Sequence, residues 1–232
     1  MKILALDTAL SACSACVLAD GAEAPESIET LPMERGHAEA LLPLIDRVMA
    51  RAEGGFESLG RIAVTVGPGS FTGLRVGLAA ARAFGLARRI PVAGISTLAA
   101  IAAPLVIEQK PGLVVSAIDA HHGNVYFAAF GPYGRAVIAP RLATAREAVR
   151  ALGAGPVRLA GPGARPLASE ASAAGTSAEI AQLSGVDIVY VARLGLLADP
   201  RQTPPRPVYL SAVKAKAKEM QEPHHPPAAA AP

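Results

Sequence analysis

The chain has 232 residues, of which 51% are hydrophobic and 18% are charged, and it carries no tryptophan and a net charge of +3. This length allows one large domain or two small ones with proper cores. No apolar stretch of about 18 residues is free of charges and helix breakers, which argues against a membrane span. The first ten residues lack the apolar region of a signal peptide, so we expect a cytoplasmic protein with no membrane contact.

The first half of the chain alternates candidate strands with candidate helices. Apolar β-rich runs that stop at turn signals such as Asp20-Gly21 are typical of strands. Apolar residues at helical spacing, as in "HAEALLPLIDRVMARA", indicate amphipathic helices. We predict strands at 2–7, 13–19, 61–66 and 90–96 and helices at 36–52, 72–88 and 97–108, the last one broken near Pro104.

The pattern starts again after Lys110-Pro111-Gly112. Residues 113–139 predict three strands separated by turns. A helix at 144–152, a strand at 157–161 and a helix near 186–198 are predicted to follow, after which prolines keep residues 199–210 extended. The low-complexity end, "EPHHPPAAAAP", predicts a disordered tail, which we place at 214–232.

A faint internal repeat joins the two halves. "LALD" and "SAID" end in Asp7 and Asp119, and a second strand follows each of them after a short polar turn. The repeat predicts an α/β protein with two lobes of one topology, at 1–108 and 109–213, the second being smaller. This is the outline of the two-lobed actin-like fold, a duplicated ribonuclease H-like fold in which the paired Asp-bearing turns face each other across a nucleotide cleft.

The stretch "VTVGPGSFTGLRVG" at 64–77 forms a glycine-rich turn between a strand and a helix. A phosphate cradle is one interpretation, but the glycines at 67, 69 and 73 match neither the P-loop nor the dinucleotide spacing. A nucleophile elbow is another, but Ser70 lacks the G-x-S-x-G context. His121 and Asp119 could complete a triad with it only by coincidence of folding.

A third interpretation comes from the helix after the turn, in which Gly73, Gly77, Ala81 and Gly85 form a row at i, i+4 spacing. Each glycine inside a helix costs roughly 0.5–1 kcal/mol relative to alanine, so the row needs a close neighbour in return. That neighbour is either the protein's own sheet or a partner helix. For the second case we predict a partner interface made of Leu41, Ile45, Val48, Gly73, Leu74, Gly77, Ala81 and Gly85.

Cys13 and Cys16 form a C-x-x-C sequence, which is also found in redox and zinc sites. No second cysteine pair or histidine pair completes a zinc site. An odd separation within a strand points the two side chains to opposite faces. We therefore expect two small buried residues of a protein in a reducing compartment.

Several segments together resemble the bacterial TsaB family, also called YeaZ, over nearly the whole chain up to about residue 213. They are "ILALDTALSACS", "HAEALLPLID", "VTVGPGSFTGLRVGLAAARAFG", "IPVAGISTLAAIA", "IDAHHGNVYFAAF" and "PVYL". The resemblance implies a role in making threonylcarbamoyladenosine in tRNAs that read codons beginning with A. It also implies pairing with the catalytic subunit TsaD through the first two helices, here 36–52 and 72–88, with the ATPase TsaE joining the pair.

The resemblance also indicates which catalytic parts are lacking. TsaD-type proteins bind a metal through H-x-x-x-H, and here Thr97 and Ile101 stand at those positions, so no metal site and no catalytic residue is predicted. Asp7, Thr8 and Asp119 are candidates for a nucleotide cleft, but "DTALS" lacks the glycine of kinases, and a structural Asp at each turn is an equal alternative. No intrinsic cofactor is predicted, with ATP or ADP and magnesium expected only at a subunit interface.

The favoured hypothesis is a non-catalytic scaffold subunit that forms homodimers when alone and pairs with TsaD when it is available. One alternative is an actin-like nucleotide-binding protein with weak ATPase activity, and the other is a peptidase. Contact with tRNA is expected through the complex. Three lysines cluster near the end, at Lys214, Lys216 and Lys218. They are either a solvated run of charges or a direct contact with tRNA.

Overall fold

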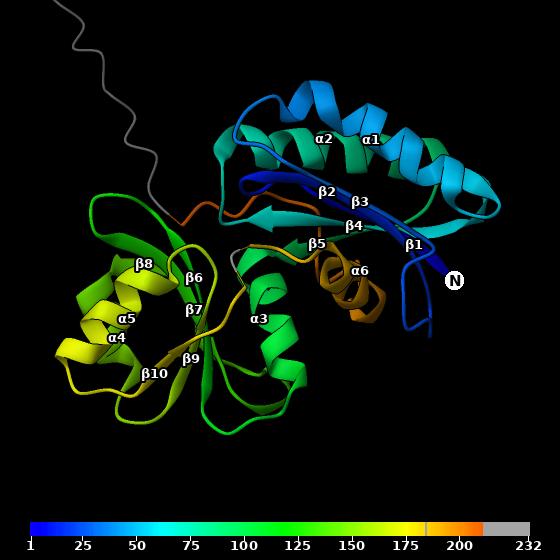
Figure 1. Cartoon of the computed structure of the whole chain (residues 1–232). Coiled ribbons are helices and arrows are strands. Elements are labelled where there is room, and N and C mark those ends of the chain that lie inside the picture. Colours follow the sequence, from blue (N-terminus) through cyan, green and yellow to red (C-terminus); the bar gives the residue numbers. More distant parts are fainter. Residues whose placement is uncertain (184, 211–232) are drawn as a thin grey trace, which may run out of the picture.

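A computed structural model describes residues 1–183 and 185–210 (Figure 1). The predicted tail at 214–232 lies outside the described residues. In chain order the elements are β1 (Lys2–Asp7), β2 (Ala12–Ala19), β3 (Ser27–Pro32), α1 (His37–Arg51), η1 (Gly55–Ser58), β4 (Leu59–Gly67), α2 (Phe71–Arg88), β5 (Val92–Ser96), α3 (Thr97–Ile107), β6 (Leu113–Asp119), β7 (Asn124–Phe130), η2 (Pro132–Gly134), β8 (Ala136–Thr144), α4 (Ala145–Leu152), β9 (Val157–Ala160), α5 (Ala164–Ala173), β10 (Ala178–Ile180) and α6 (Ile188–Leu197).

The described strands form two sheets of the same topology, one in each lobe. Their orders are β3-β2-β1-β4-β5 and β8-β7-β6-β9-β10. In the first sheet β1 pairs antiparallel with β2 and parallel with β4, and in the second β6 pairs antiparallel with β7 and parallel with β9. Asp7 and Asp119 end the two equivalent central strands. The predicted duplication and the two-lobed α/β fold are confirmed.

Two helices cover one face of each sheet. α1 and α2 lie together above the first sheet, and their apolar residues form one core with the inward side chains of β1, β2 and β4 (Figure 1). α4 and α5 cover the second sheet in the same way, packing around the fully buried Phe127. Each lobe therefore has a core of its own, as expected from strands whose apolar runs are buried on both faces.

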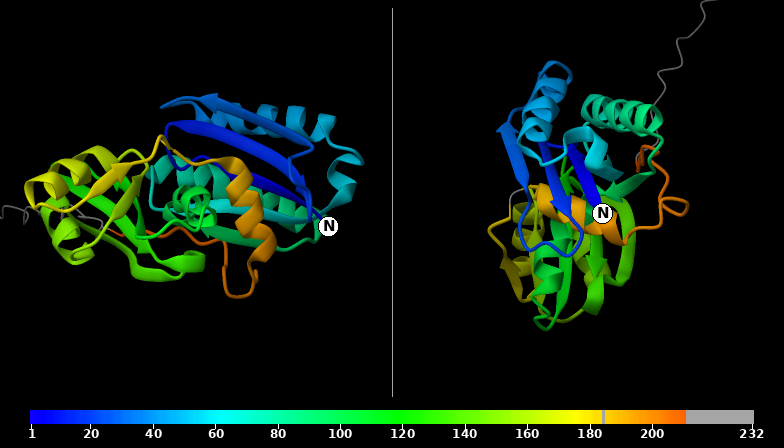
Figure 2. Two further views of the ribbon diagram at one scale, coloured as in Figure 1. Left: turned by 60° about the horizontal axis from the view of Figure 1, so that its bottom comes forward. Right: turned by 90° about the vertical axis from the view of Figure 1, so that its right-hand side faces the viewer.

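The lobes are joined because each provides a helix that covers the other. α3 follows the last strand of the first sheet, yet its Leu98 and Ile101 belong to a core with Ile118 and Phe130 of the second sheet. α6 follows the last strand of the second sheet, yet its residues pack on β1, β2 and β4 of the first. Figure 2 shows α6 lying against the first sheet, far along the chain from the strands that it covers. The predicted boundary between 1–108 and 109–213 therefore needs a correction, since 188–210 return to the first lobe.

The segment after α6 is fixed to the first lobe by backbone hydrogen bonds. Val208 N–H donates to the Val66 carbonyl at 2.7 Å, and Gly94 N–H donates to the Thr203 carbonyl at 2.8 Å. The Arg61 guanidinium donates to three carbonyls at the end of α6, at 2.8–3.0 Å, which satisfies acceptors that a helix end leaves free. Residues 199–210 contain no helix or strand, as the prolines predicted.

The sequence-based prediction of the elements needs correction at three missed elements and one helix. β3, α5 and β10 were not predicted, and α3 runs through Pro104 to Ile107 instead of breaking there. β3 is an edge strand whose side chains are alternately exposed, so it lacks an apolar signal. Pro104 removes a single backbone donor, and buried Ile101 and Leu105 keep the last turn packed.

A signal for α5 was present in the sequence. Gly161-Pro162-Gly163 repeats Gly67-Pro68-Gly69, and each triplet connects a parallel strand to the following helix.

In the part of the chain that the structure describes, no helix is long and apolar enough to cross a membrane.

The glycine row of α2 faces inward, against the protein's own first hairpin. A Cβ at Gly73 would overlap the Thr8 carbonyl oxygen, and one at Gly77 would lie 2.5 Å from Thr8 Oγ1. Thr8 Oγ1 donates to the Gly73 carbonyl at 2.7 Å, so the helix and the turn are locked together. Of the two alternatives above, the structure shows the first, in which the glycine row packs against the protein's own fold.

The residues predicted as a partner interface are therefore buried inside the chain. This correction applies to the whole set, Leu41, Ile45, Val48, Gly73, Leu74, Gly77, Ala81 and Gly85. The physical reason is that an apolar stripe at helical spacing marks the inner face of a surface helix before it marks anything else.

We predict that Gly73→Ala lowers the free energy of unfolding by about 1–3 kcal/mol, because the added methyl group has no room beside the Thr8 backbone. Ala79→Gly, on the exposed face of the same helix, should cost about 1 kcal/mol through helix propensity alone. Urea denaturation measures both. A stabilising effect of Gly73→Ala, as expected from helix propensity, would contradict the close contact.

Candidate functional site: the interlobe cleft

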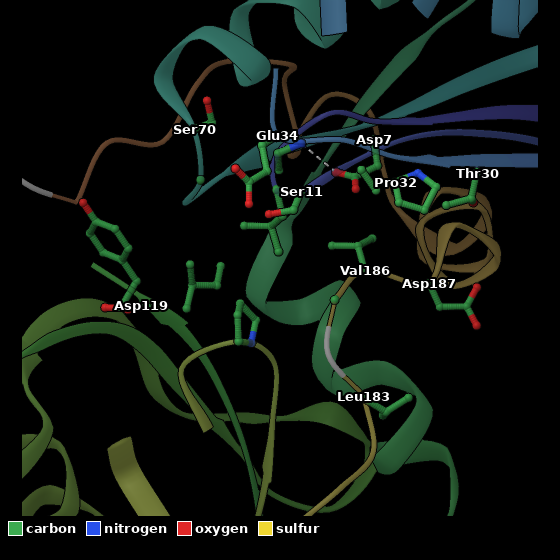
Figure 3. A pocket seen from close by; sticks show the side chains of 18 of the residues that line it. Asp7, Ser11, Thr30, Pro32, Glu34, Ser70, Asp119, Leu183, Val186 and Asp187 are labelled. Carbon is green, nitrogen blue, oxygen red and sulfur yellow. Dashed lines mark hydrogen bonds between the residues drawn. The ribbon is translucent and has the colours of Figure 1, made fainter. Parts of the chain in front are cut away.

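A cleft of about 1050 Å³ opens between the two lobes (Figure 3). Its walls come from the turns after β1 and β6, the end of β3, the two Gly-Pro-Gly turns and the connection that leads to α6. Asp7 and Asp119 both line it, from opposite lobes. The structure thus brings together the two turns that the sequence paired.

Each of these aspartates closes its own turn. Asp7 Oδ1 accepts a hydrogen bond from Ala9 N–H at 3.1 Å, and Asp119 Oδ1 accepts one from His121 N–H at 2.7 Å. A bond from a carboxylate to the backbone N–H two residues ahead is the usual Asx-turn role of aspartate. The two turns therefore use their aspartates in the same structural way.

Asp7 and Thr8 are buried and already bonded. Thr65 Oγ1 donates to Asp7 Oδ1 at 2.6 Å, and only 1% of Asp7 is exposed. Burial raises the pKa of the Asp7 carboxyl, and the hydrogen bonds from Thr65 and Ala9 oppose that rise. His37 stabilises the same turn, since its Nε2 lies 3.1 Å from the Leu10 carbonyl oxygen.

The remaining charges of the cleft are negative. Glu34, Asp119 and Asp187 are exposed carboxylates on its walls, whereas none of the described lining residues is lysine or arginine. Two N–H groups at the Gly-Pro-Gly turns are engaged, since Ser70 N–H donates to the Ala9 carbonyl and Gly163 N–H to the Ala117 carbonyl, at 2.8 and 2.9 Å. Phosphates are held by cations or by free N–H groups, and the described lining has no lysine or arginine for this role.

Glu34 and Asp187 are cleft residues that the sequence did not indicate. They come from the loop after β3 and from the N-cap of α6, where Asp187 Oδ1 accepts from Val189 N–H at 2.9 Å. Neither lies in a motif or at a spacing related to Asp7. Only the folding of distant segments onto one cleft brings them together.

Ser70 acts as a helix cap. Its Oγ accepts a hydrogen bond from Gly73 N–H at 3.3 Å at the start of α2. A serine at this position is explained by that bond, which satisfies one of the free donors of the helix. The hydrogen bonding of Ser70 gives no support to a nucleophile.

The two residues that stand at the H-x-x-x-H positions expected from the resemblance lie in the interior. Thr97 is 0% and Ile101 1% exposed, both on α3. Within residues 1–183 and 185–210, no group of three or more His, Cys, Asp and Glu side chains is arranged to hold a metal ion.

Cys13 and Cys16 are free and fully buried, and they point to opposite faces of the first sheet as predicted. Cys13 joins the core beneath α1 and α2, and Cys16 joins the core beneath α6. Burial is the main cause that raises the pKa of Cys13 to about 11 and that of Cys16 to about 12. Neither thiol is suited to redox chemistry, which needs an accessible thiolate.

Solved structures of other proteins place the chain in a structural class. A Pseudomonas aeruginosa protein described as uncharacterized, with similarity to the peptidase YeaZ, has a TM-score of 0.71 and 23% identity, over 90% of this chain and 99% of its own. A hexokinase of the ROK type from Thermus thermophilus has a TM-score of 0.50 and 17% identity, over 85% and 99%. The fold and the paired aspartate turns define a two-lobed protein of the actin and hexokinase class.

A family model described as TsaD, tRNA N6-adenosine threonylcarbamoyltransferase, matches residues 31–188, and the chain belongs to this family. Among curated proteins, the tRNA threonylcarbamoyladenosine biosynthesis protein TsaB of Escherichia coli K12 is 35% identical over 130 residues, which are 56% of this chain and 55% of that protein. The similarity to TsaB (YeaZ) proteins is therefore confirmed. The chain spans about half the length of the curated relatives it matches.

The buried Asp7 predicts a particular dependence of stability on pH. Because its pKa is raised on folding, the folded state holds the proton more tightly, and stability is lost as the pH rises from the ordinary carboxyl range through the raised pKa. Asp7→Asn keeps an acceptor for Thr65 and Ala9 but cannot ionise, so the loss of stability with rising pH should become smaller. Asp7→Ala loses both bonds and should cost about 1–3 kcal/mol. Urea denaturation at a series of pH values checks this, and parallel curves for Asp7→Asn and the native chain would refute it.

Proposed function

We propose that this chain is a non-catalytic partner subunit of the machinery that makes threonylcarbamoyladenosine in tRNA, and that it acts in the cytoplasm. The observation that carries the proposal is the family match over residues 31–188, together with a curated relative named for the biosynthesis of this nucleoside. The partner is a TsaD-type catalytic subunit, with a TsaE-type ATPase joining the pair. Contact with tRNA takes place through the complex.

The chemistry of the cleft favours a non-catalytic role for this chain. Thr97 and Ile101, which the resemblance places at the metal-binding positions of TsaD-type proteins, are buried, and neither is a histidine. Asp7, Thr8 and Ser70 each have a structural hydrogen bond that accounts for them. We therefore expect the chain to contribute to the reaction by binding a partner through its surface.

The outer faces of α1 and α2 are the proposed partner surface. These helices form the outermost layer of the first lobe (Figure 1). They expose Leu42 by 57% and Leu86 by 82%, and Ala79 and Ala83 lie on the exposed side of α2. Small side chains beside large apolar ones allow another helix pair to approach closely. A second copy of this chain would use the same faces when TsaD is absent.

A nucleotide in this assembly would be held mainly by the partner subunit. ATP or ADP with magnesium needs positive groups around its phosphates, and the described lining of this cleft has no lysine or arginine. We therefore place any such nucleotide at the subunit interface, outside the cleft of this chain.

The function is tested by replacing the native TsaB of a depleted Escherichia coli strain with this chain and its own TsaD partner. We expect threonylcarbamoyladenosine to be restored, as measured by mass spectrometry of digested tRNA. The partner expressed alone is the control. Restoration by the partner alone, or none with both proteins, would contradict the proposed role.

We predict that Leu86→Glu weakens binding to the TsaD partner at least tenfold, about 1.4 kcal/mol, because a charge replaces an exposed apolar anchor of α2. Leu197→Glu is the matched control, since Leu197 is 84% exposed at the end of α6 and should leave binding unchanged. Co-purification and calorimetric titration measure both variants. Equal binding would place the interface elsewhere on the surface.

A further inference from the structure

The described chain ends beside the acidic cleft. Tyr209 packs on Phe71 with ring centroids 5.3 Å apart, and Phe71 is the direct neighbour of the cleft residue Ser70. Val208 N–H donates to Val66 just before the first Gly-Pro-Gly turn, another wall of the cleft. The last described residues are therefore fixed at the edge of the cleft.

The sequence that follows has the charge that the cleft lacks. Residues 211–218 read "SAVKAKAK", with lysines at every second position and no acidic residue. In an extended segment, side chains two residues apart point to the same side, so the three ammonium groups can share one face. The cleft presents three exposed carboxylates, from Glu34, Asp119 and Asp187.

We propose that residues 211–218 of this chain dock in its own interlobe cleft, with their lysines against the cleft carboxylates. Extended chain covers roughly 3.3 Å per residue, so Lys214 can reach about 13 Å and Lys218 about 26 Å from Leu210. The tether also gives the segment a high effective concentration at the cleft, which a free peptide would not have. The apolar parts of the walls, such as Leu10 and Ile118, suit the alanines and the lysine stems.

Docking of the tail would make the cleft a self-occupied site. It pairs the cleft carboxylates with cations, and it keeps the lysines away from other anions. Because the pairs are at the surface, the docked state weakens as salt is raised. The inference concerns the isolated chain and does not depend on the role proposed in tRNA modification.

Paramagnetic relaxation in the full-length chain tests the proposal directly. A nitroxide is attached to Ala217→Cys, whose side chain would face away from the lysines, and Cys13 and Cys16 stay unlabelled because they are fully buried. We expect broadening of the amide signals of residues 119–121 and 185–187 at low salt. Broadening should be lost at high salt and should be absent from the outer face of α1.

A charge-neutral cleft provides the decisive comparison. Asp119→Asn and Asp187→Asn keep the turn and the cap while removing charge, and with Glu34→Gln they should abolish the broadening. The matched control neutralises three exposed acids elsewhere, Glu39→Gln, Asp46→Asn and Glu179→Gln, and should retain it. Circular dichroism verifies that both triple variants are folded.

Other occupants give different results, each of which would overturn the proposal. No broadening at the cleft, or broadening that survives in the neutral variant, excludes docking by charge. Broadening only when labelled and isotope-enriched chains are mixed shows a second copy. A lysine-dependent affinity for tRNA without any broadening assigns the segment to nucleic acid.

Discussion

The contact on which the rest of the structure depends is the one between the first hairpin turn and the start of α2. Thr8 bonds to Gly73, and Ser70 N–H bonds to the carbonyl of Ala9. The second lobe repeats part of this arrangement, with Gly163 bonded to the carbonyl of Ala117 at the end of β6. In both lobes the glycines allow helix and hairpin to touch backbone to backbone, which no larger residue permits. In this chain the glycine-rich turns bind the backbone of the neighbouring hairpin strands.

This constraint explains the structural role of the aspartates that line the cleft. The duplicated turns still place Asp7 and Asp119 on facing walls. Each of them, however, accepts a hydrogen bond from the backbone of its own turn, and Asp7 accepts a second one from Thr65. Asp7 is 1% exposed, and its hydrogen bonds from Ala9 and Thr65 make it part of the turn. The cleft left between the lobes is acidic, and its possible ligands are therefore cationic.

The exchange of α3 and α6 makes the core of each lobe depend on a helix that the other lobe provides. Apolar residues of α3 join the second sheet and those of α6 join the first, so neither lobe buries its sheet without the other. Arg61 and the hydrogen bonds of residues 203–208 fix the return of the chain to the first lobe. The same path carries the end of the described chain to the edge of the cleft. A domain boundary drawn once along the sequence cannot describe such an arrangement.

The sequence by itself determined the class of the fold, the duplication and most elements, because strand and helix periods and turn residues act locally. The repeat of Asp7 and Asp119 was visible for the same reason. The direction in which the glycine row of α2 faces, the burial of Asp7 and the gathering of Glu34 and Asp187 were decided only by tertiary structure. Apolar residues that face the core and apolar residues that face a partner have the same spacing in a helix. An edge strand such as β3 has no continuous apolar pattern. What lies across from a residue depends on how distant segments pack, and no local pattern contains that information.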